Sequence, residues 1–535
     1  MKIKSITIFL FIIITISTTS IAYSINEAKQ LTSSNKNSLE VTWQYNYGDE
    51  LTDYAMDVLE TNDGGFITVG RYSESSEISK GWVIKTHSDG TIDWDEKYGK
   101  TDTNYFRKIL KTNNGYIIGG SSNSELSNSR DFWVVKIYED GTVDWQEKYD
   151  QSNSLDLFTD ITKTSDNCYV LLGSTLAGED YGSPLLIKID DRGIEQKRTI
   201  YDRYLDDNTE DTHLFDIDLT NDGGFICVGY IQKKDISDYD FFILKLDKNL
   251  KEEWNNTFDS GSDLDWCYSI CETNNGYVLT GEYYYEELGK PHIGLWVVKT
   301  DSYGQYLKNM KYKGINKHAS GFFIEQLENG NFIITGKTGD QYDEDYSDLL
   351  VLEINQNLEE VCSKNLGGAY DDDGKAVRQT NDNGFVVVGA KNGDDTAQDL
   401  WILKLNYVTN EFKPDTPVGE TSGLTGTKYR YTTSVVHPEG LDIKFGWDWN
   451  GDEEVDEWTE EFYSSGQTAE IYHKWSDDGF YLVHVKAKDI KELESEWSDP
   501  LRVSMPKARV IQPNILIYIF ERICQYPLIK QILNL

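Results

Sequence analysis

The sequence predicts an all-β fold, and three of its features lead to that prediction. Hydrophobic residues make up 39% of the chain, which is enough for a packed core. Aromatic residues make up 13% and glycine is plentiful at 43, a composition that favours short strands joined by tight turns. A unit of turn and apolar run also recurs along the chain. At 535 residues, the chain is long enough for two or more domains.

The first repeated motif is a turn rich in Asn, Asp and Gly, followed by an aromatic residue and a β-branched run that ends at a glycine. In the first copy the turn begins at Asn62 and the run ends at Gly70. These turn residues tolerate the positive φ that tight hairpins need. The aromatic residues of the successive copies are Phe66, Tyr116, Tyr169, Phe225, Tyr277, Phe332 and Phe385. Their spacing of 50 to 56 residues defines seven units.

Two further motifs complete each unit. A short apolar run, from Trp82 to Lys85 in the first unit, predicts a buried strand, and a Trp-containing strand follows it. The first unit therefore predicts strands near 54–61, 65–72, 81–87 and 91–98. Four strands cannot bury both faces of a sheet alone, so we expect the units to stack around an axis. This arrangement is a seven-bladed β-propeller over residues 40–406.

The two ends of the repeat region complement each other. The seventh unit stops at Leu405 after three strands, and its missing Trp-containing strand has a match from Val41 to Gly48. We therefore expect this N-terminal strand to complete the last blade and close the ring, which leaves no open face between blades.

Within residues 40–406 the chain resembles a propeller-repeat family of microbial exported proteins. That family combines a Trp strand with Tyr-Gly, an Asp-Gly-Gly-aromatic turn and an Asp-x-Trp-x-x-Lys run. The matching aspartates of the last run are Asp131, Asp240, Asp348 and Asp399, whereas Lys80, Ser183 and Gly294 depart from it. The resemblance implies a scaffold and does not imply an enzyme. Because residues repeated in every unit serve the stack, we expect the repeated Asp, Lys and Trp residues to stabilise contacts between blades.

A second domain follows a stiff, proline-containing linker at residues 407–417. Residues 418–505 are again strand-like, with alternating polarity from Tyr481 to Ala487. The segment resembles the PKD domain, an Ig-like β-sandwich. The stretches that carry the resemblance are 437–440, 447–452, 473–475, 479–481 and 495–499. The resemblance implies an exterior spacer or a contact with proteins or glycans.

One loop of this second domain suggests a calcium site. Asp448, Asn450, Asp452 and Asp456 offer oxygen ligands at the spacing of a Ca²⁺-binding loop. Glu453 stands where such a loop needs glycine, and Thr459 stands where it needs a bidentate glutamate. The alternative is an acidic hairpin without an ion. The sequence predicts no other cofactor.

The formal charge of −40 argues against nucleic acid as a partner, because such a surface repels phosphate backbones. Residues 1–22 have the pattern of a secretory signal peptide, with Lys2 and Lys4 before an apolar run and small residues before the expected cleavage site after Ala22. We therefore expect a secreted or cell-surface protein, with an uncleaved N-terminal anchor as the alternative to a cleaved signal peptide. Its six cysteines are scattered and predict no disulfide framework.

The C-terminal tail, residues 506–535, is unusually apolar. Glu521, Arg522 and Pro527 interrupt it, so a transmembrane helix is not expected. A peripheral contact with a membrane, a sorting function, or a helix docked on the protein's own surface are the alternatives.

These features predict a non-enzymatic binding or adhesion scaffold with an extracellular glycan or protein as its partner. The sequence contains none of the common catalytic motifs, which favours a protein that is not an enzyme. The alternatives are an extracellular polysaccharide-active hydrolase or lyase and a purely structural surface-layer or stalk protein. Loops with clustered tyrosines provide the candidate ligand-binding residues, since such rings stack on sugars or grip peptides. They are Tyr283, Tyr284, Tyr285, His292, Tyr342 and Tyr346.

Overall fold

The computed structural model describes residues 38–505, apart from short gaps, together with residues 518, 521 and 522. The gaps are 101–102, 124–129, 152–153, 177–181, 202–208, 234–237, 288, 315–317, 340–345, 394–396, 409–411, 439 and 491–492. The expected signal peptide and most of the apolar tail therefore lie outside the described residues. The described part of the chain is all-β and divides into two compact units, Met1–Val408 and Thr409–Leu535.

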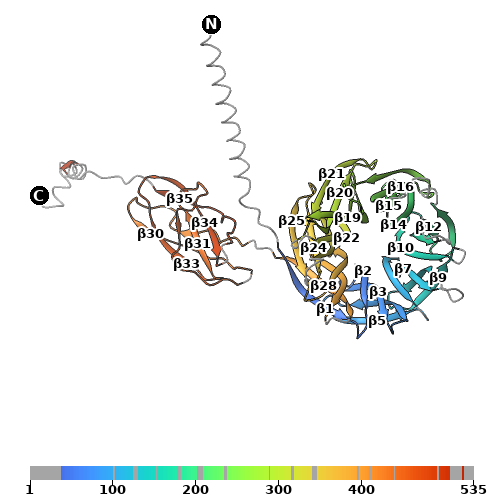
Figure 1. Cartoon of the computed structure of the whole chain (residues 1–535). Coiled ribbons are helices and arrows are strands. Elements are labelled where there is room, and N and C mark those ends of the chain that lie inside the picture. The colour runs from blue at the N-terminus through green and yellow to red at the C-terminus, as the bar shows by residue number, and fades with distance from the viewer. Residues whose placement is uncertain are drawn as a thin grey trace, which may run out of the picture. The chain divides into compact units, whose positions relative to one another are not determined.

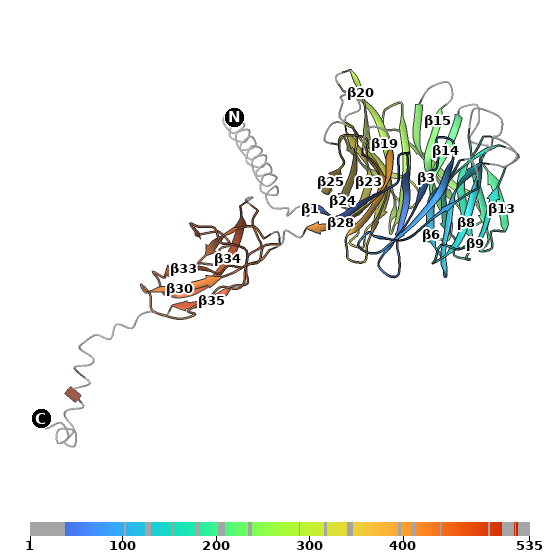
Figure 2. The ribbon, with the colours of Figure 1, turned by 90° about the horizontal axis from the view of Figure 1, so that it is seen from below.

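The first unit contains seven four-stranded antiparallel sheets in the described residues, arranged around a common centre (Figure 1). Figure 2 shows this unit from the side, with long strands running between its two faces. The first four sheets are β2 (Tyr54–Glu60), β3 (Phe66–Ser73), β4 (Ser79–Thr86) and β5 (Ile92–Tyr98); β6 (Asn104–Lys111), β7 (Gly115–Asn123), β8 (Arg130–Tyr138) and β9 (Val143–Tyr149); β10 (Leu155–Lys163), β11 (Tyr169–Leu176), β12 (Ser183–Ile189) and β13 (Glu195–Ile200); and β14 (Thr209–Leu219), β15 (Phe225–Lys233), β16 (Asp238–Leu246) and β17 (Glu252–Phe258).

The remaining three sheets follow the same order from the centre outward. They are β18 (Asp265–Thr273), β19 (Gly276–Glu287), β20 (Lys290–Thr300) and β21 (Tyr306–Tyr312); β22 (His318–Gln326), β23 (Phe332–Gly339), β24 (Asp348–Ile354) and β25 (Glu360–Leu366); and β26 (Asp373–Gln379), β27 (Phe385–Asn392), β28 (Gln398–Val408) and β1 (Ser38–Tyr47). The last sheet thus takes its fourth strand from the N-terminal end of the unit, where Trp43 lies opposite Lys404.

The repeated turns form the hairpins between the first and second strands. Gly64 has a φ of +78°, which a glycine adopts without cost. In the third sheet the turn contains no glycine, and Asn167 takes the left-handed conformation there with a φ of 57°. Gly70, where the apolar run ends, lies inside β3 and within the strand expected at 65–72. The reason for a glycine at that position is the bulge described below.

Hydrophobic contacts continue from sheet to sheet, including the last and the first. Ala55 and Val58 of β2 share a buried cluster with Val388 of β27 and Leu400 of β28. Polar contacts repeat as well, because a tyrosine at the end of the fourth strand donates to a carbonyl of the following sheet. The pairs are Tyr98 with Gly141 (2.6 Å), Tyr149 with Gly193 (2.7 Å) and Tyr201 with Leu250 (2.6 Å). Tyr47 makes the same bond to Gly90, from the last sheet to the first.

The second unit consists of two sheets that share one core. The strands are β29 (Val418–Gly419), β30 (Lys428–Thr433) and β33 (Ala469–Lys474) in one sheet and β32 (Glu457–Trp458), β31 (Ile443–Asp448), β34 (Gly479–Asp489) and β35 (Leu501–Met505) in the other. The core includes Tyr431, Phe445, Trp447 and Val485, all fully buried. Among the residues that the structure describes, no helix combines the length and the apolar character that a membrane span requires.

Candidate binding site at the inner strands

A β-bulge recurs at the same place in the innermost strand of every sheet. In β2 the pairing with β3 skips one residue between Ala55 and Asp57, so that Met56 has no partner across the ladder. Such a bulge re-aims a side chain and is common next to functional sites. The residues skipped in the seven strands are Met56, Arg107, Thr159, Phe215, Tyr268, Phe322 and Lys375.

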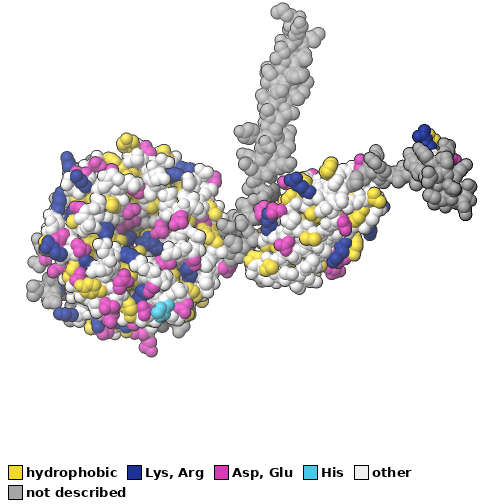
Figure 3. All heavy atoms as spheres, turned by 180° about the vertical axis from the view of Figure 1, so that it is seen from behind, with side chains coloured by type: hydrophobic (Ala, Val, Ile, Leu, Met, Phe, Trp, Pro, Cys, Tyr) yellow, Lys and Arg dark blue, Asp and Glu magenta, His cyan; other side chains and the backbone are white. Residues whose placement is uncertain are grey.

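All seven bulged residues line one pocket of about 450 Å³. The inner strands β2, β10, β14 and β22 lie nearest the centre of the unit in Figure 1, and the pocket is formed where the seven inner strands converge. On the face seen in Figure 3, acidic and basic side chains lie interspersed around this centre. The bulges therefore gather seven variable side chains in one cavity.

A glycine on the second strand makes each bulge possible. Gly70 lies opposite Ala55, and a Cβ atom built on it would lie 1.9 Å from the Tyr54 carbonyl oxygen of the inner strand. The equivalent glycines, with the same close approach to an inner-strand carbonyl, are Gly120, Gly173, Gly229, Gly281, Gly336 and Gly389. The glycine at the end of each apolar run is thus the sequence signal that could have predicted the bulge.

One side of the pocket is an aromatic arc that we define as Phe215, Tyr268 and Phe322. The ring centroids of Phe215 and Tyr268 are 5.4 Å apart, and those of Tyr268 and Phe322 are also 5.4 Å apart. The ammonium of Lys375 lies 4.6 Å from the Phe322 ring centre. The arc can therefore contact an apolar or aromatic group, with a cation at one end.

Arg107 supplies a second cation at the pocket wall. Its guanidinium carbon lies 5.8 Å from the ring centre of Tyr105, and its buried Nε atom has no hydrogen-bond partner. Burial would raise the pKa of the Tyr105 hydroxyl, but the charges of Arg107 and Arg130 hold this pKa below its usual value. A guanidinium in a pocket wall is suited to a carboxylate.

Beneath the bulged residues lies a buried charged group formed by Lys108, Asp160 and Asp216. The Lys108 ammonium is 3.3 Å from Asp160. Burial raises the pKa of Asp160 well above its usual value, with Asp216 acting in the same direction and Lys108 opposing both. Burial also opposes the charge on Asp216, but Lys108 and the bond from Asp160 hold the pKa of Asp216 below its usual value.

These inner carboxylates also join neighbouring sheets. Asp57 accepts from the Ile109 backbone N–H of the next sheet at 3.2 Å, and Asp160 accepts in the same way from Ile217 at 3.1 Å. Asp216 accepts from Ile270 at 2.9 Å. Because these oxygens are held by the stack, the bulged residues rather than the carboxylates are the groups free to meet a ligand.

Among the described residues, the tyrosines expected to bind a ligand do not line this pocket. Tyr283, Tyr285 and His292 stack on one another along β19 and β20, with ring centroids 5.4 Å and 5.3 Å apart. Tyr284 is half-buried in the same hairpin. Tyr346 contacts Tyr370 at 5.2 Å between ring centroids.

Tyr342 lies outside the described residues. A ligand role for the tyrosines and His292 stays a prediction. The pocket could not be predicted from the sequence, because the residues that line it come from seven strands spread along the chain.

The expected calcium loop of the second unit is held by its own backbone. Asp448 is fully buried, and its two carboxylate oxygens accept from the N–H groups of Asn450 (3.0 Å), Gly451 (2.7 Å) and Glu453 (2.9 Å). Asp456 accepts from Trp449 at 2.8 Å. Calcium binding at Asp448, Asn450, Asp452 and Asp456 stays a prediction.

Comparison with known proteins finds two solved structures of peptidase propellers that are similar to this chain. No known family and no curated protein matches the sequence. The β-propeller domain of the trilobed protease from Pyrococcus furiosus is similar to 66% of this chain and 93% of its own, with 9% identity and a TM-score of 0.37. The acylaminoacyl peptidase of Pyrococcus horikoshii is similar over 72% of this chain and 59% of its own, also with 9% identity and a TM-score of 0.37.

These similarities correct two expectations. We expected a non-enzymatic binding or adhesion scaffold and a protein that is not an enzyme; both expectations are contradicted, because the propellers similar to this chain are domains of peptidases. A third similar structure is the PKD domain of an M14-like peptidase from a Thermoplasmatales archaeon. It is matched over 100% of its length and 18% of this chain, with 40% identity and a TM-score of 0.17. The chain is an all-β protein whose four-stranded sheets around a common centre form a propeller fold, and it contains a region similar to a PKD domain.

Proposed function

We propose that this chain is an exported, peptidase-related protein whose propeller binds peptide segments in the pocket of bulged residues. The observation that carries the proposal is the pocket itself, where seven re-aimed side chains meet in about 450 Å³. A peptide offers the three groups that this lining complements: apolar side chains, carboxylates and amines. The peptidase origin of the similar propellers is consistent with such a ligand.

The pocket favours one kind of peptide. Its aromatic arc would hold an apolar or aromatic side chain, and the guanidinium of Arg107 in the pocket wall would bind a carboxylate. Asp373 pairs with Lys375 at 2.8 Å, so Lys375 is already partly neutralised and Arg107 is the stronger anion site. We infer a preference for a peptide whose C-terminal residue is apolar, since that residue combines both groups.

In this proposal the seven sheets are the blades of a seven-bladed propeller that β1 closes. The pairing of β1 with β28 and the hydrophobic cluster between the first and last sheets support closure. Residues 418–505 would be the PKD domain, an Ig-like sandwich, which the two facing sheets and their shared core support.

We also propose export through residues 1–22, a location outside the cell, and an extracellular protein or peptide partner with no role for nucleic acid. A peripheral contact through residues 506–535 stays a prediction.

Peptide binding by the full chain tests the proposal. A fluorescent peptide ending in a free carboxylate after phenylalanine would be titrated beside its amidated form, and hydrolysis followed by mass spectrometry. Phe215→Ala and Arg107→Gln should each weaken binding about ten-fold or more. The matched control is Tyr303→Ala, which removes a ring that is 72% exposed and does not line the pocket.

Amidation should weaken binding to the wild type but have little further effect on Arg107→Gln. Unchanged peptide affinity in both pocket variants, or no peptide binding by the wild type, would contradict the proposal. Cleavage of a bound peptide would support it and show that the chain carries the chemistry itself.

A further inference from the structure

Aspartate pairs recur where the third strand of one sheet meets the first strand of the next, a place that we call a junction. At four junctions an aspartate stands on both sides. The pairs are Asp131 with Asp156, Asp240 with Asp265, Asp348 with Asp372, and Asp399 with Asp53. The third-strand members are the repeated aspartates of the Asp-x-Trp-x-x-Lys run. The aspartates that face them lie in the next unit and were not predicted from the sequence.

The two members of each pair are present or absent together. At the three other junctions neither position carries a carboxylate. The residues there are Lys80 and Asn104, Ser183 and Thr212, and Gly294 and Ala319. Two aspartates that face each other repel, so their joint presence is unfavourable unless something between them compensates the charge. The pattern indicates a shared ligand rather than two independent polar residues.

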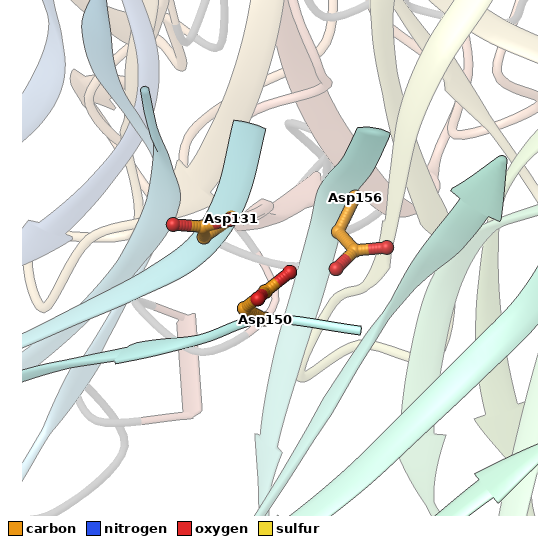
Figure 4. A group of neighbouring side chains, drawn as sticks. All are labelled: Asp131, Asp150 and Asp156. Atoms are coloured by element: carbon orange, nitrogen blue, oxygen red, sulfur yellow. The ribbon is translucent and has the colours of Figure 1, made fainter. Parts of the chain in front are cut away.

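Two of these junctions contain a third carboxylate and form a compact triad. One oxygen each of Asp131, Asp150 and Asp156 lies within 4.8 Å of the other two, and Figure 4 shows the three side chains together. Asp240, Asp259 and Asp265 form the same group at the second junction. Oxygens that share one Ca²⁺ at 2.3–2.6 Å are at most about 5 Å apart, so the spacing is that of ligands around a single ion.

The other two pairs also approach closely. At the position of the third carboxylate they carry Gly48 and Gly367. A Cβ atom on Gly48 would lie 2.7 Å from oxygens of both Asp399 and Asp53, and one on Gly367 would lie within 2.7 Å of both Asp348 and Asp372. The same facing geometry therefore occurs with two side-chain carboxylates instead of three.

An independent observation at the two triads points to a ligand. The side chain of Asp131 is only 4% exposed, and its buried Oδ1 atom has no hydrogen-bond partner. Asp240 is 3% exposed, and its Oδ1 atom also lacks a partner. A buried carboxylate oxygen without a donor is costly, so each of these atoms needs a proton or a cation.

The opposite member of each triad is already oriented. Asp156 accepts from the Gln151 N–H at 2.6 Å and from the Ser154 hydroxyl at 2.8 Å. Asp265 accepts in the same way from Ser260, through its N–H at 2.6 Å and its hydroxyl at 2.7 Å. These donors fix the direction of the carboxylate without neutralising it. A preorganised carboxylate opposite an unsatisfied one is the arrangement of a hard-cation site.

We propose that the triads Asp131–Asp150–Asp156 and Asp240–Asp259–Asp265 bind divalent cations of the calcium type, which join neighbouring sheets of the propeller. The two sites differ in strength. Lys233 lies 2.9 Å from Asp240 and partly neutralises the second triad, whereas no described lysine or arginine forms an ion pair with Asp131. The first triad is the stronger site. Because this site has three carboxylates but no dedicated binding loop, it should bind calcium about as weakly as extracellular modules do, with a Kd on the order of 10⁻⁴ to 10⁻³ M.

The experiment uses the full chain after treatment with EDTA. Calcium is added in calorimetric titrations and in thermal unfolding, with magnesium as the comparison. The wild type should bind calcium and unfold at a temperature several degrees higher in 5 mM calcium, on the order of what a site at ten-fold saturation provides. The double variant Asp131→Asn/Asp240→Asn should lose both responses.

A comparison of the metal-free proteins distinguishes loss of the calcium site from misfolding of the double variant. Without calcium, Asn removes the repulsion in each triad and can donate to its neighbours, so the metal-free double variant should unfold at or above the temperature of the metal-free wild type. Asp452→Asn, in the loop of the second unit, is the matched control and should keep the calcium response of the propeller. A wild type that ignores calcium, or a calcium response that survives in the double variant and disappears with Asp452→Asn, would overturn the proposal.

Discussion

Asp57 and Arg378 connect the first and the last sheet of the propeller: the Arg378 Nη2 atom lies 3.0 Å from Asp57 Oδ1, although 321 positions separate the two residues. The same guanidinium donates to Glu325 of the sixth sheet at 2.8 Å. Burial opposes the charge on Arg378, but Asp57 and Glu325 outweigh it and raise the pKa of Arg378. One side chain thus links three inner strands.

Removing that link should destabilise the propeller strongly. Arg378→Met leaves the buried carboxylate of Asp57 and the partly exposed carboxylate of Glu325 without their cation, so the free energy of unfolding should fall by about 3 kcal/mol. Denaturant unfolding followed by tryptophan fluorescence measures the change. Arg192→Met is the control, because Arg192 pairs with Asp190 at an exposed turn, and it should leave the transition unchanged. Equal stability of the two variants would contradict the role assigned to Arg378.

The N-terminal strand should be essential to the stability of the whole first unit. Deleting residues 40–48 removes most of β1 and exposes the edge of β28, so we expect a lower melting temperature or aggregation on purification. A milder change, Leu39→Ala, removes a side chain that is 1% exposed and should cost about 3 kcal/mol. Gln44→Ala, at an exposed position of the same strand, should have little effect. Normal melting of the deletion variant would show that closure by β1 is not needed.

Asp218 should make stability depend on pH. Burial, then the neighbouring Asp216, raises its pKa from 3.8 to about 7, while Lys108 acts in the opposite direction. A carboxyl whose pKa is raised by folding stabilises the protein when protonated, so this contribution is present below about pH 4 and is lost as the pH rises to 7 and above.

Asp218→Asn should therefore flatten the decline in stability between pH 4 and 7 and exceed the wild type by about 1–2 kcal/mol at pH 8. Unfolding free energies across this range measure the effect. Asp263→Asn, at an exposed position of the same unit, should follow the wild-type curve. A variant that is less stable than the wild type at pH 8 would contradict the raised pKa.

The glycines opposite the bulges should not tolerate a side chain. In Gly336→Ala the new methyl group would lie 1.9 Å from the Ser320 carbonyl oxygen, so the inner strand must shift and stability should fall by about 2 kcal/mol. Gly393→Ala is the control, since nothing lies within 4 Å of its Cβ position. Thermal unfolding distinguishes the two. A comparable melting temperature for both would mean that the bulge adjusts without cost.

Local pattern was sufficient to predict the strands and their order. The first unit was expected near 54–61, 65–72, 81–87 and 91–98, and its strands are 54–60, 66–73, 79–86 and 92–98. The turn at Asn167 shows why a degenerate copy still works, because asparagine can replace glycine in the left-handed region. The match of the strand around Trp43 to the incomplete last unit predicted its pairing with β28.

The candidate site was less accessible to sequence reasoning, because it depends on contacts between units. Met56 and Lys375 lie far apart in the chain and meet only where the inner strands converge. The partners of Asp131 and Asp240 are similarly one sheet away, so the repeats showed the third-strand aspartates but not the carboxylates facing them. Loop tyrosines such as Tyr283 were predicted to bind a ligand because they are clustered in the sequence. In the structure their rings stack on one another within one hairpin.

The bulges allow the residues that line the cavity to be substituted during evolution. Each inner strand presents one residue that has no partner in the ladder, while the adjacent residues carry the contacts between sheets. Substitutions at the seven bulged positions can therefore alter what the cavity accepts without disturbing the supporting framework. The lining of the cavity can thus vary while the contacts between the sheets are kept, in the way that loops vary on a rigid scaffold.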